Sequence, residues 1–228
     1  MATRAAKILL QRSPLFGGLS APVLEHIASI AVQRRFDSGT LIFSQGDPVD
    51  ALYCVVMGKI RISAATADGR EVFLNVMEAG DSFGEIALLD GRARTATATA
   101  IMPCELLAIR RDQFLTVLER EPILVRELLR LCGERLRWTS GLAEDAALLS
   151  VEARLAKRLL GLGELRGERQ LDGPFTTRIS QAELGSFLGI SRQIVNQYLQ
   201  EWKRQGWVEL GRGSITVRNP AALKAGTQ

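Results

Sequence analysis

Two pairs of residues about ten positions apart, Gly84-Glu85 and Arg94-Thr95, have the chemistry to bind a nucleotide together. A glycine lets the backbone approach a ligand closely, and the N–H groups at the start of a helix attract an anion. Arg94 presents a planar fork of donors that suits a phosphate, and Thr95 adds a hydroxyl. A carboxylate such as Glu85 beside an anion site is explained if it accepts hydrogen bonds from sugar hydroxyls. Together these groups indicate a nucleotide.

The segment that contains both pairs, Phe83 to Ala100, resembles the phosphate-binding cassette of cyclic-nucleotide-binding domains. The resemblance implies that Glu85 binds the ribose 2′-hydroxyl and that Arg94 and Thr95 bind a 3′,5′-cyclic phosphate. It also implies a contribution from the neighbouring backbone. The cassette residues beyond these are Phe83, Gly84, Ile86 and Ala87. The alternative is that Glu85 and Arg94 are ordinary surface charges beside a strand of alternating Thr and Ala.

The residues before and after the cassette predict a small antiparallel β domain. Short apolar runs are separated by turn residues throughout, which is typical of a barrel or sandwich. The runs are Gln33 to Ala65 (several strands), Glu71 to Met77, and Cys104 to Ile109, with Asp68-Gly69 as a hairpin turn. A helix is expected from Ser20-Ala21-Pro22 onward. The whole stretch from about residue 15 to 112 resembles a cyclic-nucleotide β-roll.

A long helix is expected from Pro122 to about residue 150. Apolar residues recur in it at spacings of four and three, which favours a parallel dimer. The predicted seam is Leu124, Leu128, Leu131, Arg135, Trp138, Leu142, Asp145 and Leu149. The alternative is that this stripe packs along the helix's own barrel.

In the family resembled here, this long helix lies over the nucleotide and a Thr-Ser pair on it meets the base. Thr139-Ser140 matches that pair, with Arg135 one turn earlier, and Ser140 would reach the partner subunit's nucleotide. The base itself stays open: Thr95 resembles cGMP-preferring domains, and Thr139-Ser140 resembles the pair that meets adenine in cAMP-dependent regulators. Between the two nucleotides, cGMP is slightly favoured as the allosteric effector.

The charge of the chain is unevenly distributed. Residues 151–228 carry 12 Lys and Arg against 7 Asp and Glu, a net +5, whereas the whole chain has a net charge of +4. A basic C-terminal part indicates a polyanionic partner.

The remaining composition excludes several other classes. The single histidine, His26, rules out a His-ligated zinc site or a Ser-His-Asp triad, and the three dispersed cysteines suggest neither a disulfide framework nor a metal cluster. With no long apolar run and no secretory signal, a cytoplasmic protein without membrane contact is expected.

The C-terminal part predicts a winged helix-turn-helix. Ser180-Gln181-Ala182-Glu183 is a capping box that opens a short helix, and Ser191 caps a second helix after Gly189. Two strands joined by Gly211-Arg212-Gly213 then form the wing. Ser150 is the expected hinge between the long helix and the next one, Val151 to Leu162.

The exposed start of the second helix would contact the bases of double-stranded DNA. Arg192 suits guanine, and Gln193 or Gln197 suits adenine. Asn196 lies on the same end of the helix. Phosphate contacts are expected from Ser180, Gln181, Ser191 and Arg212.

The sequence Ile190 to Val195 resembles the recognition helix of the CRP/FNR family of bacterial regulators. Gln193 and Gln197 stand where members often carry Glu and Arg, so the best-known operator of the family is not expected. The resemblance implies an α+β fold in three parts: a jelly-roll-like antiparallel β-roll over residues 1–120, a dimerisation helix and hinge over 121–150, and a winged helix-turn-helix over 151–228.

The function implied is that of a transcription regulator and not an enzyme. It would be a homodimer whose DNA-binding modules a cyclic nucleotide repositions on a pseudo-palindromic site, with RNA polymerase as a further candidate partner. Two alternatives stay open. The cassette is vestigial or takes another effector, or the chain is a nucleotide-regulated enzyme, which no nucleophile–base pair, metal cluster or Walker loop supports.

Overall fold

The computed structural model describes residues 2–65, 71–164 and 173–225. The chain divides into two compact units, residues 1–69 with 74–137 and residues 70–73 with 138–228. The division falls inside the long helix α5, Pro122–Leu148. In the described part of the chain, no helix has both the length and the apolar character that a membrane span requires.

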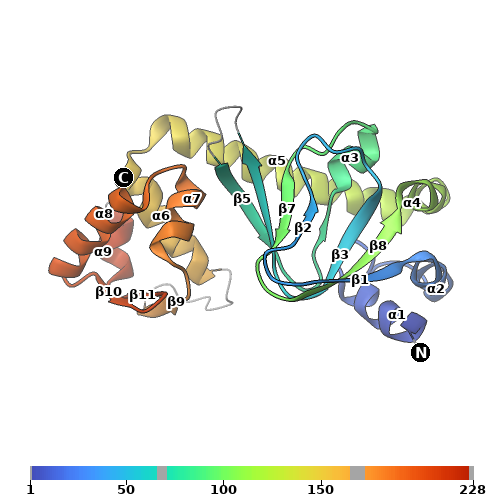
Figure 1. Cartoon of the computed structure of the whole chain (residues 1–228), viewed down its shortest axis with the longest axis horizontal. Coiled ribbons are helices and arrows are strands. Elements are labelled where there is room, and N and C mark those ends of the chain that lie inside the picture. Colours follow the sequence, from blue (N-terminus) through green and yellow to red (C-terminus); the bar gives the residue numbers. More distant parts are fainter. Residues whose placement is uncertain (1, 66–70, 165–172, 226–228) are drawn as a thin grey trace. The chain divides into compact units, whose positions relative to one another are not determined.

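Two four-stranded sheets form the framework of the N-terminal unit (Figure 1). One has the order β1 (Val32–Phe36), β8 (Cys104–Arg110), β3 (Ala51–Met57) and β6 (Ser82–Phe83). The other has the order β2 (Leu41–Phe43), β7 (Thr97–Ala100), β4 (Ile60–Ala65) and β5 (Glu71–Met77). The described pairings are antiparallel, with the register set by pairs such as Tyr53 with Ala108. The predicted mixed α+β class with antiparallel sheets is therefore confirmed, while the hairpin turn expected at Asp68-Gly69 lies outside the described residues.

Helices cover one end of this framework and enclose the larger of its two cores. They are α1 (Ala2–Arg12), α2 (Ala21–Ile30), α4 (Arg111–Leu118) and the first turns of α5. Phe16, Leu24 and Phe114 are almost completely buried there with Leu52 and Ile109 of the sheet. The predicted start of α2 is confirmed, since Ser20 occupies its N-cap position. Helix α1 was not predicted from the sequence.

The inward face of α5 differs from the dimer seam expected for it. Leu124 and Leu128 are 0% and 3% exposed within the core of their own unit, and Leu131 packs against the same core. The alternative, that this stripe packs along the helix's own barrel, is therefore correct for these residues. The residues one position further along, Val125 and Leu129, are exposed instead. The two stripes have the same spacing, so periodicity alone does not distinguish them.

The C-terminal unit holds the end of α5 and a helical domain with a small sheet. Its elements are α6 (Val151–Glu164), β9 (Phe175–Thr177), α7 (Gln181–Leu188), α8 (Arg192–Arg204), β10 (Val208–Gly211), β11 (Ser214–Val217) and α9 (Pro220–Ala225). The sheet has the order β10-β11-β9, all antiparallel. Leu155, Leu184, Leu199, Trp202 and Val217 lie at the centre of the core.

Several local expectations for this unit can be compared with the structure. Ser150 separates α5 from α6, and its Oγ accepts a hydrogen bond from the Ala153 N–H at 3.1 Å, as its role as a cap predicted. Helix α6 begins at Val151 as predicted and ends at Glu164, two residues beyond the predicted end at Leu162. Strand β9 and helix α9 were not predicted.

Candidate functional site

Gly84 stands immediately before α3 (Glu85–Asp90), where the predicted cassette begins. Its φ of 86° lies in the left-handed region, which side chains disfavour. A Cβ atom at this position would also lie 2.5 Å from Nη1 of Arg94. Glycine is therefore required twice, by its backbone conformation and by the close approach of the arginine.

Arg94 lies directly against this glycine, so the structure brings the two predicted pairs together. Its guanidinium is almost completely buried, with the side chain 1% exposed. Nη1 donates to the Gly84 carbonyl at 2.9 Å, and Nη2 donates to Asp50 Oδ1 at 2.6 Å and to the Ala51 carbonyl at 2.7 Å. The main chain of Arg94 is held as well, because its N–H donates to the Asp47 carbonyl and its carbonyl accepts from the Gly46 N–H.

A cluster of three aromatic rings supports the guanidinium. The Cζ atom of Arg94 lies 4.2 Å from the ring centroid of Phe43 and 5.7 Å from that of Tyr53. Phe83, a predicted cassette residue, stacks on Tyr53 with centroids 5.4 Å apart. Cation–π attraction and burial fix the plane of the guanidinium.

The Nε–H donor of Arg94 is left over once the contacts among the described residues are counted. Its Nε is buried and has no hydrogen-bond partner among the described residues. A buried unsatisfied donor costs free energy, so such a group in a native fold calls for an acceptor. A phosphate oxygen is the acceptor that this donor chemistry fits best.

Asp50, which precedes β3, was not identified from the sequence. Its carboxylate accepts from Arg94 and, through Oδ2, from the Tyr53 hydroxyl at 2.8 Å. Burial raises the pKa of Asp50, but the hydrogen bonds from Tyr53 and Arg94 outweigh it and leave that pKa below its usual 3.8. The sequence does place Asp50 three residues before Tyr53 of a predicted strand. Many surface aspartates stand at a similar distance from a tyrosine, so this spacing did not single out Asp50.

Glu85, the first residue of α3, is 4% exposed and pairs with Arg135 of α5, whose Nε lies 3.8 Å from Oε1. Arg135 also donates from Nη2 to the Ser82 carbonyl at 3.1 Å. Burial raises the pKa of Glu85, and the charge of Arg135 lowers it in part. The structure thus places Arg135, a predicted base-contacting residue, against the cassette.

The other predicted cassette residues have varied surroundings. Within α3, Ala87 is buried and Ile86 is 44% exposed, while Thr95, which follows the helix, is exposed. Thr139 and Ser140 are exposed on α5 beyond residue 137, in the C-terminal unit. They follow Arg135 by about one turn of the same helix.

In the C-terminal unit, the predicted capping box is present at the start of α7. Ser180 Oγ accepts from the Glu183 N–H at 3.1 Å, and the Glu183 carboxylate accepts from the Ser180 N–H at 2.7 Å. The turn to α8 is tight, because a Cβ on Gly185 would lie 2.7 Å from the Ile190 carbonyl oxygen. Ser191 Oγ accepts from the Ile194 N–H at 3.3 Å and caps α8, as predicted.

The residues expected to face DNA lie on the surface of this unit. Ser191, Arg192, Gln193 and Gln197 are exposed, as is Arg212 at the tip of the β10–β11 wing, while Ser180, Gln181 and Asn196 are partly exposed. Ser180 and Ser191 accept capping bonds, so each keeps its own O–H to donate to a phosphate. The inward face of α8 consists of Val195, Leu199 and Trp202, which are buried, whereas Ile194 is 39% exposed.

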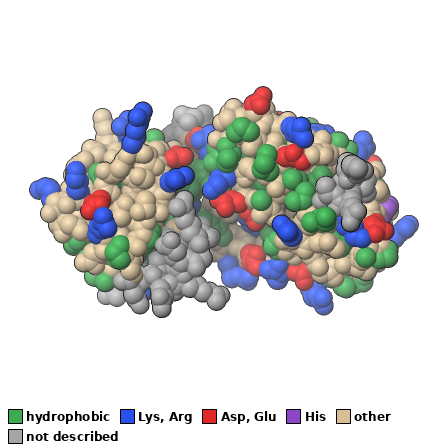
Figure 2. All heavy atoms as spheres, turned by 90° about the horizontal axis from the view of Figure 1, so that it is seen from below, with side chains coloured by type: hydrophobic (Ala, Val, Ile, Leu, Met, Phe, Trp, Pro, Cys, Tyr) green, Lys and Arg blue, Asp and Glu red, His purple; other side chains and the backbone are tan. Residues whose placement is uncertain are grey.

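The surface of the C-terminal unit carries Lys and Arg side chains that are spread over the face in view and do not form one dense patch (Figure 2). Among the described residues, no group of His, Cys, Asp and Glu has an arrangement that could hold a metal ion.

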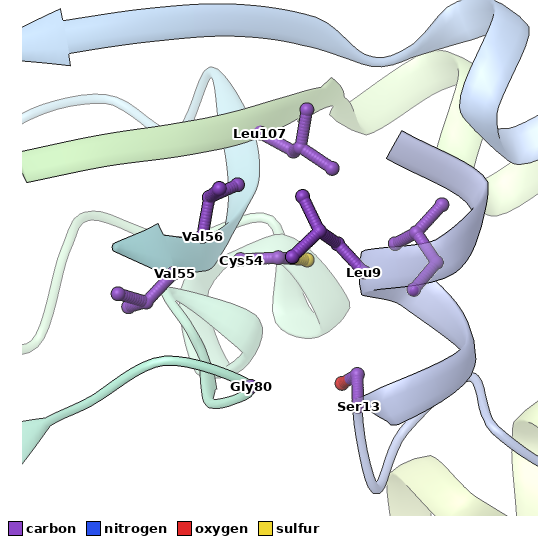
Figure 3. Close-up of a pocket in the computed structure, with 8 residues that line it drawn as sticks. Leu9, Ser13, Cys54, Val55, Val56, Gly80 and Leu107 are labelled. Atoms are coloured by element: carbon purple, nitrogen blue, oxygen red, sulfur yellow. The ribbon is translucent and has the colours of Figure 1, made fainter. Parts of the chain in front are cut away.

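A small cavity of about 10 Å³ lies elsewhere in the N-terminal unit, between α1 and β3 (Figure 3). Leu9, Cys54, Val56 and Leu107 give it an apolar wall, and the Ser13 hydroxyl, which has no hydrogen-bond partner among the described residues, lies beside it. This volume holds about one water molecule. The cavity is therefore too small for a nucleotide and separate from Arg94.

Comparison with known protein families gives two matches that together span most of the chain. Residues 33–121 match the cyclic nucleotide-binding domain, and residues 153–225 match the Crp-like helix-turn-helix domain.

Individual relatives align along nearly the whole chain. The cyclic AMP receptor protein of Thermus thermophilus is 36% identical, over 94% of this chain and 97% of its own. The CRP-like cAMP-activated global transcriptional regulator of Mycobacterium tuberculosis is 30% identical, over 94% and 96%. Among solved structures, the Thermus thermophilus catabolite activator protein has 34% identity and a TM-score of 0.54, covering 94% of this chain and 98% of its own. The global regulator CLP of Xanthomonas campestris has 23% identity and a TM-score of 0.77, covering 88% and 100%, and shows the shared fold.

Proposed function

Because this chain belongs to the CRP/FNR family of bacterial transcription regulators, we propose that it is a homodimer whose DNA binding is controlled by a cyclic nucleotide at Arg94. A cyclic-nucleotide-binding domain and a helix-turn-helix domain make it a regulator and not an enzyme. The effector, the dimer and the control of one domain by the other are the proposed parts.

The observation that carries the proposal is the buried, unpartnered Nε–H of Arg94 beside Gly84 and Glu85. The phosphate of the nucleotide would accept from this donor and from backbone N–H groups at the start of α3. Glu85 would accept from the ribose 2′-hydroxyl, and Arg135 would hold the Glu85 carboxylate in place.

We propose cAMP as the effector. The slight preference for cGMP, which depended on Thr95, finds no support among the relatives, two of which are named for cAMP. Thr139 and Ser140 would then meet the adenine, and their position just past Arg135 on α5 agrees with this role.

The exposed stripe of α5 is the dimer surface that we propose. It consists of Val125, Leu129 and Leu136, of which the last two are each 67% exposed. Large apolar side chains at spacings of four and seven on one helix are typical of a helix–helix interface. It replaces the first part of the seam expected from the sequence, because Leu124, Leu128 and Leu131 pack in the core of their own unit.

A titration tests the proposal directly. Calorimetry of the full chain with cAMP and with cGMP should give one site per chain and tighter binding of cAMP. Binding to a pool of random DNA duplexes should become sequence-selective only with the bound nucleotide. A cassette that is vestigial would bind neither nucleotide, and selective DNA binding without nucleotide would point to another effector or none.

A further inference from the structure

We infer that Asp50 is a built-in anion that competes with the phosphate of the nucleotide for Arg94, and so lowers the affinity for the effector. This inference depends on the proposed function, because it assigns a regulating residue to the same site. The Oδ1 atom of the Asp50 carboxylate lies 2.6 Å from Nη2 of Arg94.

The first step is the charge balance around Arg94. A buried guanidinium stays charged and requires a counter-ion or several acceptors. The 2.6 Å contact with Asp50 Oδ1 provides a direct ion pair, and a carboxylate whose pKa is lowered is ionised at neutral pH. In this arrangement Asp50 takes the part that a phosphate anion would take.

The two partners differ strongly in their exposure to solvent. The Arg94 side chain is 1% exposed and the Asp50 side chain is 52% exposed. Water can therefore solvate the carboxylate when it leaves, whereas the guanidinium stays in the protein. An incoming anion must therefore either displace Asp50 into the solvent or share the guanidinium with it, and Asp50 is the exchangeable partner of the two.

The donors of Arg94 show where the competition occurs. A guanidinium has five N–H donors, and Nη2 uses both of its own on Asp50 and Ala51. Only Nε–H and one N–H of Nη1 remain for a phosphate. Two negative groups would then share one cation within a few ångströms, and their repulsion opposes nucleotide binding.

The opposite role, in which Asp50 positions Arg94 for the ligand, requires the guanidinium to depend on Asp50 for its place. The guanidinium of Arg94 has other contacts that hold it: it donates to the carbonyls of Gly84 and Ala51, and its Cζ lies 4.2 Å from the ring centroid of Phe43. These contacts do not involve a carboxylate. Loss of the negative charge should therefore leave the guanidinium near its present position and more available to phosphate.

The test is Asp50→Asn, which keeps the size and an acceptor oxygen but removes the charge. We expect cAMP to bind roughly 3- to 10-fold more tightly in calorimetry at low salt, from the removal of a nearby like charge. The nucleotide should also raise the melting temperature by more than it does in wild type. Asp112→Asn is the matched control, since Asp112 is exposed and pairs with Arg110 at the surface, and it should leave the affinity unchanged.

The outcomes separate this inference from the proposed function. If wild type binds no cyclic nucleotide, the proposed function fails. If wild type binds but Asp50→Asn binds equally or more weakly, the competition is refuted alone. Should Asp50→Asn not fold, Tyr53→Phe removes the hydroxyl that anchors Oδ2 and should tighten binding by a smaller factor; unchanged or weaker binding there would equally overturn the inference.

Discussion

Arg135 Nε lies 3.8 Å from Glu85 Oε1, so one ion pair joins the long helix α5 to the first residue of α3. The pair connects the segment that would bind the sugar and phosphate to the helix that would carry the dimer contacts. Through it, a ligand that rearranged Glu85 would also act on α5. Such a link is required if the nucleotide is to favour one arrangement of the dimer over another.

Glu85→Gln should reduce the pH dependence of stability. Burial raises the pKa of Glu85 above its usual 4.5, so the protonated form favours folding. The stabilisation that protonated Glu85 provides is complete below about the usual pKa of 4.5, and it is lost as the pH rises through the raised pKa of the folded state. In guanidinium denaturation, the loss of unfolding free energy as the pH rises above the usual pKa of 4.5 should be smaller in Glu85→Gln than in wild type. Exposed Glu119→Gln should behave as wild type, and identical profiles for Glu85→Gln and wild type would refute the assignment.

Arg94→Lys should weaken cAMP binding at least roughly tenfold while the domain stays folded. Lysine keeps the positive charge but lacks the planar fork and an Nε–H donor. Arg92→Lys, at an exposed position two residues earlier, is the control and should bind normally. Equal affinity in the two variants, measured by calorimetry, would show that the phosphate does not contact Arg94.

Leu129→Glu combined with Leu136→Glu should convert a dimer into a monomer. Charges on two apolar residues that are each 67% exposed cost little in the folded chain but cannot be buried between two helices. Light scattering coupled to gel filtration would measure the mass, and circular dichroism would confirm the fold. Ile8→Glu, on the exposed face of α1, should leave the dimer intact. A dimer that survives both glutamates must use another surface.

Arg192→Ala should relax the preference at one base pair and cost roughly 1–3 kcal/mol of discrimination there. Arg204→Ala, at the far end of the same helix, should weaken binding to all sequences alike or not at all. Selection from a random duplex library would report both. An unchanged consensus in Arg192→Ala would remove this residue from the base contacts.

The three thiols should differ in reactivity towards a disulfide reagent at pH 8. Burial raises the pKa of Cys54 to about 12, and Cys104 is buried as well, so both should react only after denaturation. Cys132 is partly exposed, but burial and the charge of Glu85 raise its pKa, so its reaction should be slow. Peptide mass mapping would identify the modified residue, and fast labelling of Cys54 in the native protein would contradict its burial.

The sequence by itself determined the features that depend on neighbours along the chain. The capping box at Ser180 and the cap at Ser191 each follow from local hydrogen bonds. The cassette and the winged helix-turn-helix were recognisable for the same reason. Helices α1 and α9 were missed, although α9 has a local start signal: Pro220 is its first residue, and Asn219 Oδ1 accepts a hydrogen bond from the Ala222 N–H at 3.0 Å.

The tertiary structure alone decided which groups meet across the fold. Leu128 and Leu129 are adjacent and equally apolar, yet Leu128 is 3% exposed and Leu129 is 67% exposed. The reason is that only Leu128 faces the hydrophobic core of the N-terminal unit. Asp50 and Arg94 are far apart in sequence, and their ion pair exists because β3 and the cassette pack together around Phe43. The spacing of apolar residues predicts an apolar stripe on a helix, and the residue type determines the charge of a side chain. Which residues that stripe or charge contacts depends on which parts of the chain the fold brings together.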